Sequence, residues 1–169
     1  MSKLKHLNKA KPAGKNLQYA ALPVRASADG GLEVMLVTSR ETKRWIIPKG
    51  WPMRKLTPGA TAAREAYEEA GIEGIIRPNK AVGSYSYAKS LETGELPVTV
   101  KVFLLHVERQ RERWPEQPER ETRWFSPEAA AELVAEPELA AILRSAAELV
   151  AQANAGSGGS SSVLAGMPG

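Results

Sequence analysis

The feature that most constrains the fold is a helix signal between Thr57 and Gly71, which follows closely on an apolar, strand-like segment. Thr57 and Pro58 are typical of an N-cap and a first helical residue, and Gly71 is suited to end a helix in a left-handed conformation. The run from Trp45 to Ile47 closes at Pro48 and leads through an irregular loop into this helix. The segment therefore predicts a strand-loop-helix unit whose loop and helix face meet one anionic ligand.

This helix carries three glutamates on one face. Glu65, Glu68 and Glu69 stand at positions i, i+3 and i+4, so they are neighbours on the helix surface. Like charges at these spacings repel, and the helix dipole disfavours anions near the C-terminus. Mg²⁺ would remove both penalties, because it takes carboxylate oxygens and leaves positions for water and phosphate. Arg64, on the same turn, can hold one carboxylate in place, and a purely solvated helix face is the alternative interpretation.

Alternating segments on both sides of this helix predict strands. The first two flank Asp29-Gly30-Gly31, a composition that suits a hairpin turn because the turn needs positive φ. The expected strands are residues 19–27, 32–38, 81–90, 97–107 and 124–125. Helical sequence runs from Pro127 to about residue 153. The order of elements predicts an α/β fold with a mixed sheet between helices.

The two ends of the chain differ in composition from its middle. Five lysines precede residue 17 without any acid, so the remaining 18 basic and 19 acidic residues give a net charge of −1. We expect a disordered basic tail over residues 1–16, one folded domain over 17–153 and a flexible Gly/Ser-rich tail over 154–169. Because nucleic-acid binding usually needs a folded basic face, nucleic acid is not the expected partner.

The chain contains no cysteine, which excludes disulfides and thiolate chemistry and is typical of a reducing compartment. No segment approaches the roughly 20 apolar residues that span a bilayer, and the N-terminus lacks the apolar stretch of a secretory signal. The sequence therefore predicts a cytoplasmic protein with no membrane partner.

The segment from Gly50 to Ile72 resembles the signature of the Nudix hydrolase family, G-x5-E-x7-R-E-U-x-E-E-x-G-U, in which U is a bulky aliphatic residue. Leu56 replaces the first glutamate, and Ala66 is smaller than the usual aliphatic residue. The matching positions after Gly50 are Arg64, Glu65, Glu68, Glu69, Gly71 and Ile72. The resemblance implies a Nudix-type α/β/α sandwich with a mixed central sheet and Mg²⁺-dependent hydrolysis of a phosphoanhydride bond.

Other segments are similar to the diphosphoinositol polyphosphate phosphohydrolase branch of this family. They are residues 34–40, 45–48, 112–114 and 120–125. The resemblance implies a small-molecule polyphosphate substrate, with diphosphoinositol polyphosphates and diadenosine polyphosphates as the candidates. Seven basic and three acidic residues lie between Val24 and Lys55, and such a segment would attract a polyanion.

Roles for individual side chains follow from the same resemblance. Glu65 and Glu69 are expected to ligate Mg²⁺, with Mn²⁺ as the alternative metal. Glu68 is the expected general base, with Arg64 as the second catalytic residue. The expected substrate-binding residues are Arg40, Lys49, Gly50 and Arg120. Spacing alone does not separate ligand from base, and three acids of a later loop are alternatives for the base: Glu116, Glu119 and Glu121.

Two further functions are compatible with the sequence. One is a catalytically weak Nudix-fold sensor of a nucleotide or metabolite, which the loss of the first glutamate at Leu56 makes conceivable. The other is hydrolysis of an ADP-ribose-type nucleoside diphosphate derivative. The sequence does not determine the oligomeric state.

Overall fold

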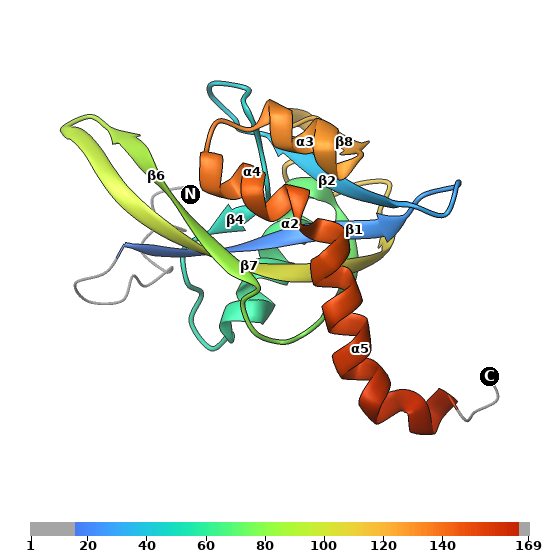
Figure 1. Cartoon of the computed structure of the whole chain (residues 1–169). Helices are drawn as coiled ribbons and strands as arrows, with labels where there is room; N and C mark the ends of the chain where they lie inside the picture. The colour runs from blue at the N-terminus through green and yellow to red at the C-terminus, as the bar shows by residue number, and fades with distance from the viewer. Residues whose placement is uncertain (1–15, 166–169) are drawn as a thin grey trace.

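The computed structural model describes residues 16–165, so the predicted basic tail over residues 1–16 lies outside the described residues except for its last position (Figure 1). An eight-stranded sheet forms the centre, in the order β3-β2-β1-β7-β5, with β4 beside β1, β6 beside β7 and β8 beside β2. The strands are β1 (Leu17–Ala26), β2 (Leu32–Thr38), β3 (Trp45–Ile46), β4 (Lys49–Gly50), β5 (Ile72–Ile76), β6 (Gly83–Leu91), β7 (Gly94–Gln110) and β8 (Thr122–Phe125).

The two central strands are parallel and the rest of the sheet is antiparallel. Strand β1 runs alongside β7, with Leu17 opposite Thr99 and Val24 opposite His106. Every other strand pairing within residues 16–165 is antiparallel. The predicted mixed sheet is therefore confirmed.

Helices cover both faces of this sheet. Helix α2 (Pro58–Ala70) lies on one face, and α3 (Pro127–Leu133) and α4 (Pro137–Arg144) lie on the other (Figure 1). Successive residues of a strand point to opposite faces. Accordingly, Ala20 and Leu22 of β1 pack in the core beneath α3 and α4, while Ala21 packs in the core beneath α2. The predicted α/β/α sandwich is confirmed.

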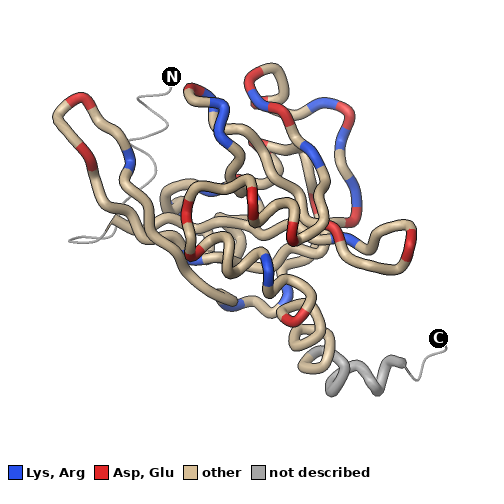
Figure 2. Tube along the Cα trace, turned by 45° about the horizontal axis from the view of Figure 1, so that its top comes forward, with Lys and Arg blue, Asp and Glu red and all other residues tan. Residues whose placement is uncertain are grey.

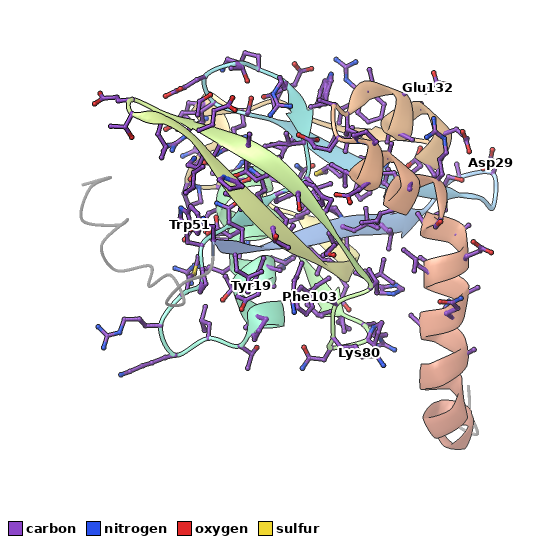
Figure 3. All side chains as sticks on the ribbon, turned by 60° about the vertical axis from the view of Figure 1, so that its left-hand side comes forward. Tyr19, Asp29, Trp51, Lys80, Phe103 and Glu132 are labelled. Atoms are coloured by element: carbon purple, nitrogen blue, oxygen red, sulfur yellow. The ribbon has the colours of Figure 1, made fainter. Side chains whose placement is uncertain are left out.

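An aromatic pair joins the two central strands on the α2 side. Tyr19 of β1 and Phe103 of β7 meet edge to face, with 6.1 Å between ring centroids and an interplanar angle of 81° (Figure 3). Phe103 belongs to the core that also contains Ala62 and Ala66 of α2. Offset and edge-to-face ring pairs are the favoured aromatic geometries, so this contact helps to fix the sheet beneath the helix.

The predicted hairpin is present, and the two strands expected over residues 81–90 and 97–107 form a second one. In the first turn Gly30 adopts a φ of 90°, and the Ser27 amide donates to the Gly31 carbonyl over 3.0 Å. The second hairpin joins β6 and β7 and extends as an arm from the body of the sheet (Figure 1). Strand β5 was not among the predicted strands, because its five residues follow the helix without an alternating pattern.

The helical sequence after Pro127 forms three helices. Pro137 lacks an N–H group, and the preceding Glu136 takes an extended conformation with ψ of 121°. Helix α5 (Ala146–Ala165) then projects from the sandwich (Figure 1).

The backbone of α5 stays helical past residue 153, where the sequence predicts a flexible tail. Each residue added to an existing helix gains a hydrogen bond, which here outweighs the weak helix propensity of Gly and Ser. In the described part of the chain, no helix is long and apolar enough to cross a membrane.

Candidate active site

Helix α2 begins and ends at the residues that the sequence predicts. The Thr57 hydroxyl accepts a hydrogen bond from the Ala60 amide over 3.2 Å, and Pro58 follows as the first helical residue. Gly71 ends the helix with a φ of 71°, and its amide donates to the Tyr67 carbonyl. These caps fix the first and last residues of the helix. The position of each glutamate along the helix then determines the direction in which its side chain points.

Gly71 is also held by an aromatic neighbour. A side-chain carbon added at Gly71 would overlap the Trp114 ring, whose Nε1 donates to the Glu69 carbonyl over 3.2 Å. Left-handed backbone is costly for other residues, so we expect Gly71→Ala to lower the free energy of unfolding by about 1–3 kcal/mol. Urea unfolding followed by tryptophan fluorescence measures this loss.

Gly30→Ala is the matched control for Gly71→Ala. Gly30 also has a positive φ, but nothing lies within 4 Å of an added side-chain carbon. The control therefore carries the backbone strain without the overlap with a ring. Equal losses for the two variants would contradict a structural role for the Trp114 contact.

Two of the three helix glutamates face inward. Glu65 is 2% exposed and Glu69 is 5% exposed. They are four residues apart, so they lie on the same side of α2. The Oε1 atom of Glu69 is buried and has no hydrogen-bond partner among the described residues. Burial, followed by the charge of Glu65, raises the pKa of Glu69 to about 8, while Arg120 and Lys49 oppose this shift.

Gly50 brings the loop backbone against this carboxylate pair. A side-chain carbon at Gly50 would overlap the Glu65 carboxylate, so only glycine allows this approach. Strand β1 holds the loop in place, because Tyr19 pairs with Gly50 and the Ala21 amide donates to the Pro48 carbonyl over 3.0 Å. The predicted strand-loop-helix unit is thus present, with its loop on the glutamate face of the helix.

A cavity of about 720 Å³ opens beside Glu65 and Glu69. Its other walls come from the loop after β2, from β6, from the loop before β8 and from the connection between α3 and α4. Five acids and five bases line it: Glu41, Glu65, Glu69, Glu116 and Glu136, with Arg40, Arg44, Lys49, Lys89 and Arg120. The structure therefore gathers six of the predicted site residues around one space, namely Arg40, Lys49, Gly50, Glu65, Glu69 and Arg120.

Lys49 is one of the cations available to a ligand in this cavity. Its Nζ lies 4.7 Å from the centre of the Tyr87 ring, a cation–π contact, and the Tyr87 hydroxyl donates to Gln18 Oε1 over 2.8 Å. Burial lowers the pKa of Lys49, and the charge of Glu69 opposes this shift. Tyr87 and Gln18 were not predicted as site residues, because nothing in their local sequence marks them.

Arg40 lies at the rim of the cavity. Its side chain is 53% exposed, and its Nη1 is 3.3 Å from Glu119 Oε1. Ion pairs between groups as exposed as these are weak. The guanidinium is therefore only weakly held by Glu119, and its predicted role in substrate binding stays a prediction.

Arg120 is the most enclosed arginine at the cavity, with 8% of its side chain exposed. Its Nε donates to Glu116 Oε1 over 2.7 Å, and its Nη1 donates to the Thr38 carbonyl over 3.0 Å. The remaining nitrogen, Nη2, is 3.6 Å from Glu69 Oε2. Arg120 thus joins the late loop to the helix glutamates, and its predicted contact with a substrate phosphate stays a prediction.

The structure does not place Glu68 and Arg64 in the cavity. Glu68 is 300° around the helix from Glu65 at 100° per residue, so it points to a neighbouring face. Its Oε2 accepts from Arg64 Nε over 3.1 Å, and the Arg64 side chain is 59% exposed. Glu116, one of the alternative acids of the late loop, borders the cavity instead.

The carboxylates that do border the cavity fit a divalent metal ion. Within residues 16–165 no group of three or more acidic, histidine or cysteine side chains is arranged to hold a metal. Mg²⁺ commonly needs only one or two carboxylates and takes its other oxygens from water and substrate phosphates. Glu65 and Glu69 offer such a pair, and a cation would compensate both their mutual repulsion and the buried Oε1 of Glu69.

Comparison with known proteins gives consistent matches. The NUDIX domain model matches residues 17–146. Nudix hydrolase 13, mitochondrial, of Arabidopsis thaliana is 32% identical over 108 residues, which is 60% of this chain and 53% of that protein. Diphosphoinositol polyphosphate phosphohydrolase 3-beta of Homo sapiens is 32% identical over 122 residues, which is 70% of this chain and 69% of that protein.

Solved structures show the same fold. A binary complex of the C. elegans Ap4A hydrolase superposes with a TM-score of 0.60 at 20% identity and covers 80% of this chain and 98% of that one. At this identity the likeness concerns the fold alone. The chain spans about half the length of several plant relatives that it matches.

Proposed function

Because the chain belongs to the Nudix family, we propose that it is an enzyme that uses Mg²⁺ to hydrolyse a phosphoanhydride bond in a diphosphate-containing small molecule. The observation that carries this proposal is the pair of buried carboxylates, Glu65 and Glu69, at the edge of a cavity that also contains Lys49. Buried like charges beside a cation-lined space are costly in a purely structural role and useful for binding metal and phosphate.

The proposed reaction is attack of water on phosphorus with cleavage of the bridging P–O bond. A bound Mg²⁺ would neutralise the phosphate oxygens and promote loss of a proton from the attacking water. Glu65 and Glu69 would hold it, and Mn²⁺ is the alternative ion. Lys49 lines the same cavity and would bind a phosphate oxygen of the substrate.

Two glutamates are candidates for the base that takes the proton. Glu68 has the position that the family resemblance implies, whereas Glu116 borders the cavity and is held by Arg120. A base must come within hydrogen-bond reach of the water, so the location of Glu116 favours it.

We expect Glu116→Gln to lower kcat at least about tenfold more than Glu68→Gln does, since general base catalysis is lost only when the base itself is neutralised. Steady-state rates of the two variants at saturating Mg²⁺ test this expectation. A larger loss for Glu68→Gln would make Glu68 the base and would restore the role that the sequence predicts for it.

A turnover screen tests the proposed function as a whole. The purified chain is incubated with Mg²⁺ and with diphosphoinositol polyphosphates, diadenosine polyphosphates, ADP-ribose or nucleoside triphosphates, and the products are separated by chromatography. The diphosphoinositol and diadenosine compounds are the candidates that the relatives suggest, and ADP-ribose represents the alternative class of substrates. Hydrolysis of none of these compounds would contradict the proposal.

A substitution at Leu56 tests whether the chain is an active enzyme or a catalytically weak sensor. Leu56 stands before the N-cap of α2, is 41% exposed and does not line the cavity. We expect Leu56→Glu to change kcat/KM by no more than about threefold, as is usual for surface positions away from a site. Initial rates against Mg²⁺ concentration measure the change, and a gain above about tenfold would favour the sensor, because restoring one acid would then rescue a disabled site.

The cellular location is also a proposal. The absence of cysteine suits a reducing compartment such as the cytoplasm, whereas several plant relatives are named as mitochondrial or chloroplastic. Fractionation of the native cells, followed by detection with an antibody, would locate the protein.

A further inference from the structure

The connection between α3 and α4 contributes an acidic side chain to the cavity. Glu136 borders the space that Glu65 and Glu69 also border, but it lies on the opposite face of the sheet from α2, at the start of α4. Its side chain is only 11% exposed. A carboxylate enclosed to this degree needs partners for both of its oxygens.

Only one oxygen of Glu136 has such a partner among the described residues. Its Oε2 lies 3.3 Å from Arg44 Nη1, whereas Oε1 is buried without a hydrogen-bond partner. The side chain does not cap α4 either, although Glu136 is the N-cap residue. The caps of α2 and α3 behave differently, since Thr57 and Ser126 both accept hydrogen bonds from their helices. The free oxygen of Glu136 is therefore not used by the local fold.

Neutral polar groups also line the cavity. Tyr87 and Gln18 are joined by their hydrogen bond, and Ser39 and Thr42 are joined by one of 2.8 Å. Tyr85 is 2% exposed, and burial together with the charge of Glu136 raises the pKa of its phenol well above the usual range. The Tyr85 hydroxyl is protonated at neutral pH, but Tyr85 does not line the cavity.

The charges around the cavity are nearly balanced. Three of its five bases are already paired, Arg40 with Glu119, Arg44 with Glu136, and Arg120 with Glu116 and Glu69. Lys49 and Lys89 form no ion pair with a described residue. Figure 2 shows acidic and basic positions interspersed over the loops of the domain rather than separated. A ligand with phosphates on every side would therefore bring some of them against carboxylates, and like charges in contact are costly.

We propose that Glu136 determines substrate specificity: its carboxylate accepts a hydrogen bond from an unphosphorylated hydroxyl or an amino group on the organic part of the substrate, and its charge excludes a phosphate from that place. This inference rests on the proposed function, and it restricts the substrates to those with an unphosphorylated organic group beside the diphosphate. The diphosphate lies toward Glu65, Glu69 and Lys49, and a neutral sugar or base lies toward Glu136. A ring that is phosphorylated at every position fits this arrangement poorly.

The test compares two substrates in the wild-type chain and in Glu136→Gln. ADP-ribose presents free sugar hydroxyls, and 5-diphosphoinositol pentakisphosphate presents only phosphates. We expect the wild type to favour ADP-ribose in kcat/KM by at least about tenfold, the value of a hydrogen bond to a charged group. In Glu136→Gln the KM for ADP-ribose should rise about tenfold with kcat little changed, since a contact made equally in ground and transition states is lost.

A second glutamate of the same helix provides the matched control. Glu138 is exposed, accepts a hydrogen bond from the Ser86 amide over 2.9 Å and does not line the cavity. Glu138→Gln should leave both KM values unchanged. A substrate ratio that is the same in Glu136→Gln as in the wild type, or a wild-type preference for the inositol compound, would overturn the proposal.

A purely structural role of Glu136 would give a different result. If Glu136 only tethers Arg44 or meets Tyr85 by a small rearrangement, Glu136→Gln lowers the thermal midpoint and weakens the binding of both substrates alike, and Tyr85→Phe reproduces its effect. That outcome would also overturn the proposal.

A binding measurement separates failure of this proposal from failure of the proposed function. If none of the compounds of the turnover screen is hydrolysed, the proposed function fails on its own. Calorimetric binding of ADP-ribose and of inositol hexakisphosphate to the wild type and to Glu136→Gln then decides the role of Glu136. Selective loss of ADP-ribose binding in the variant supports that role, and equal changes for the two compounds refute it.

Discussion

Glu69→Gln should lower kcat/KM by at least about 100-fold, because the carboxylate charge that holds the metal is lost while the size of the side chain is kept. The amide of the new glutamine stays close to Arg120. Arg120 also keeps its hydrogen bonds to Glu116 and to the Thr38 carbonyl. The fold should therefore survive. Without metal the variant should be as stable as the wild type or more stable, since burial disfavours the charged form of Glu69 and a neutral amide of the same size avoids that cost.

Initial rates across a range of Mg²⁺ concentrations, together with thermal unfolding without metal, test this expectation. Glu132→Gln is a suitable control, since Glu132 is an exposed glutamate of α3 (Figure 3) and does not line the cavity. If Glu69→Gln loses activity but keeps its stability, the charge of Glu69 serves function rather than folding. An unchanged rate and unchanged metal dependence in Glu69→Gln would refute the assignment of Glu69 as a metal ligand.

Gly50→Ala should reduce turnover by about 100-fold, although it adds only one methyl group. The added carbon would overlap the Glu65 carboxylate, which is 2% exposed and has little room to move. Either the loop or the carboxylate must shift, and a displacement of about 1 Å at a site that orients reacting groups can cost this factor. The loss should appear mainly in kcat, with a higher Mg²⁺ requirement.

Gly156→Ala is the matched control for Gly50→Ala. Gly156 lies in α5 with nothing within 4 Å of an added side-chain carbon, so the same substitution should be harmless there. If Gly50→Ala lowers the thermal midpoint as well as the rate, the double variant Gly50→Ala, Glu65→Asp relieves the overlap and should recover the midpoint but not the activity. Full activity in Gly50→Ala would show that the loop does not need to approach Glu65 so closely.

The parts of the fold that the sequence predicted well are those with strong local chemistry. Thr57, Pro58 and Gly71 bound one helix, and Gly30 marks one hairpin, because each residue favours its conformation on its own. Helix periodicity placed Glu65, Glu68 and Glu69 on one face, but only Glu65 and Glu69 border the cavity. Strand β5 was missed, since it depends on packing against β7 rather than on an alternating pattern. The breaks between the C-terminal helices were not located, although Pro137 marks one of them.

The cavity wall away from α2 was not predictable from local pattern. Glu136, Tyr87 and Gln18 come from three separate segments that meet only when the sheet forms. The pairing of Arg120 with Glu116 likewise depends on the late loop folding against β2. Residue type alone suggested a phosphate contact for Arg120, and only tertiary structure shows how many of its donors are already engaged.

The parallel pairing of β1 with β7 has a consequence for the order in which the chain folds. Leu17 meets Thr99, so the middle of the sheet joins residues about 80 positions apart. Such a contact can form only after a long loop has closed, and topologies rich in distant pairings fold slowly. During synthesis the first hairpin, β1 with β2, is complete long before β7 leaves the ribosome. Until then, the inner edge of β1 is an unpaired strand edge that is open to association with other chains.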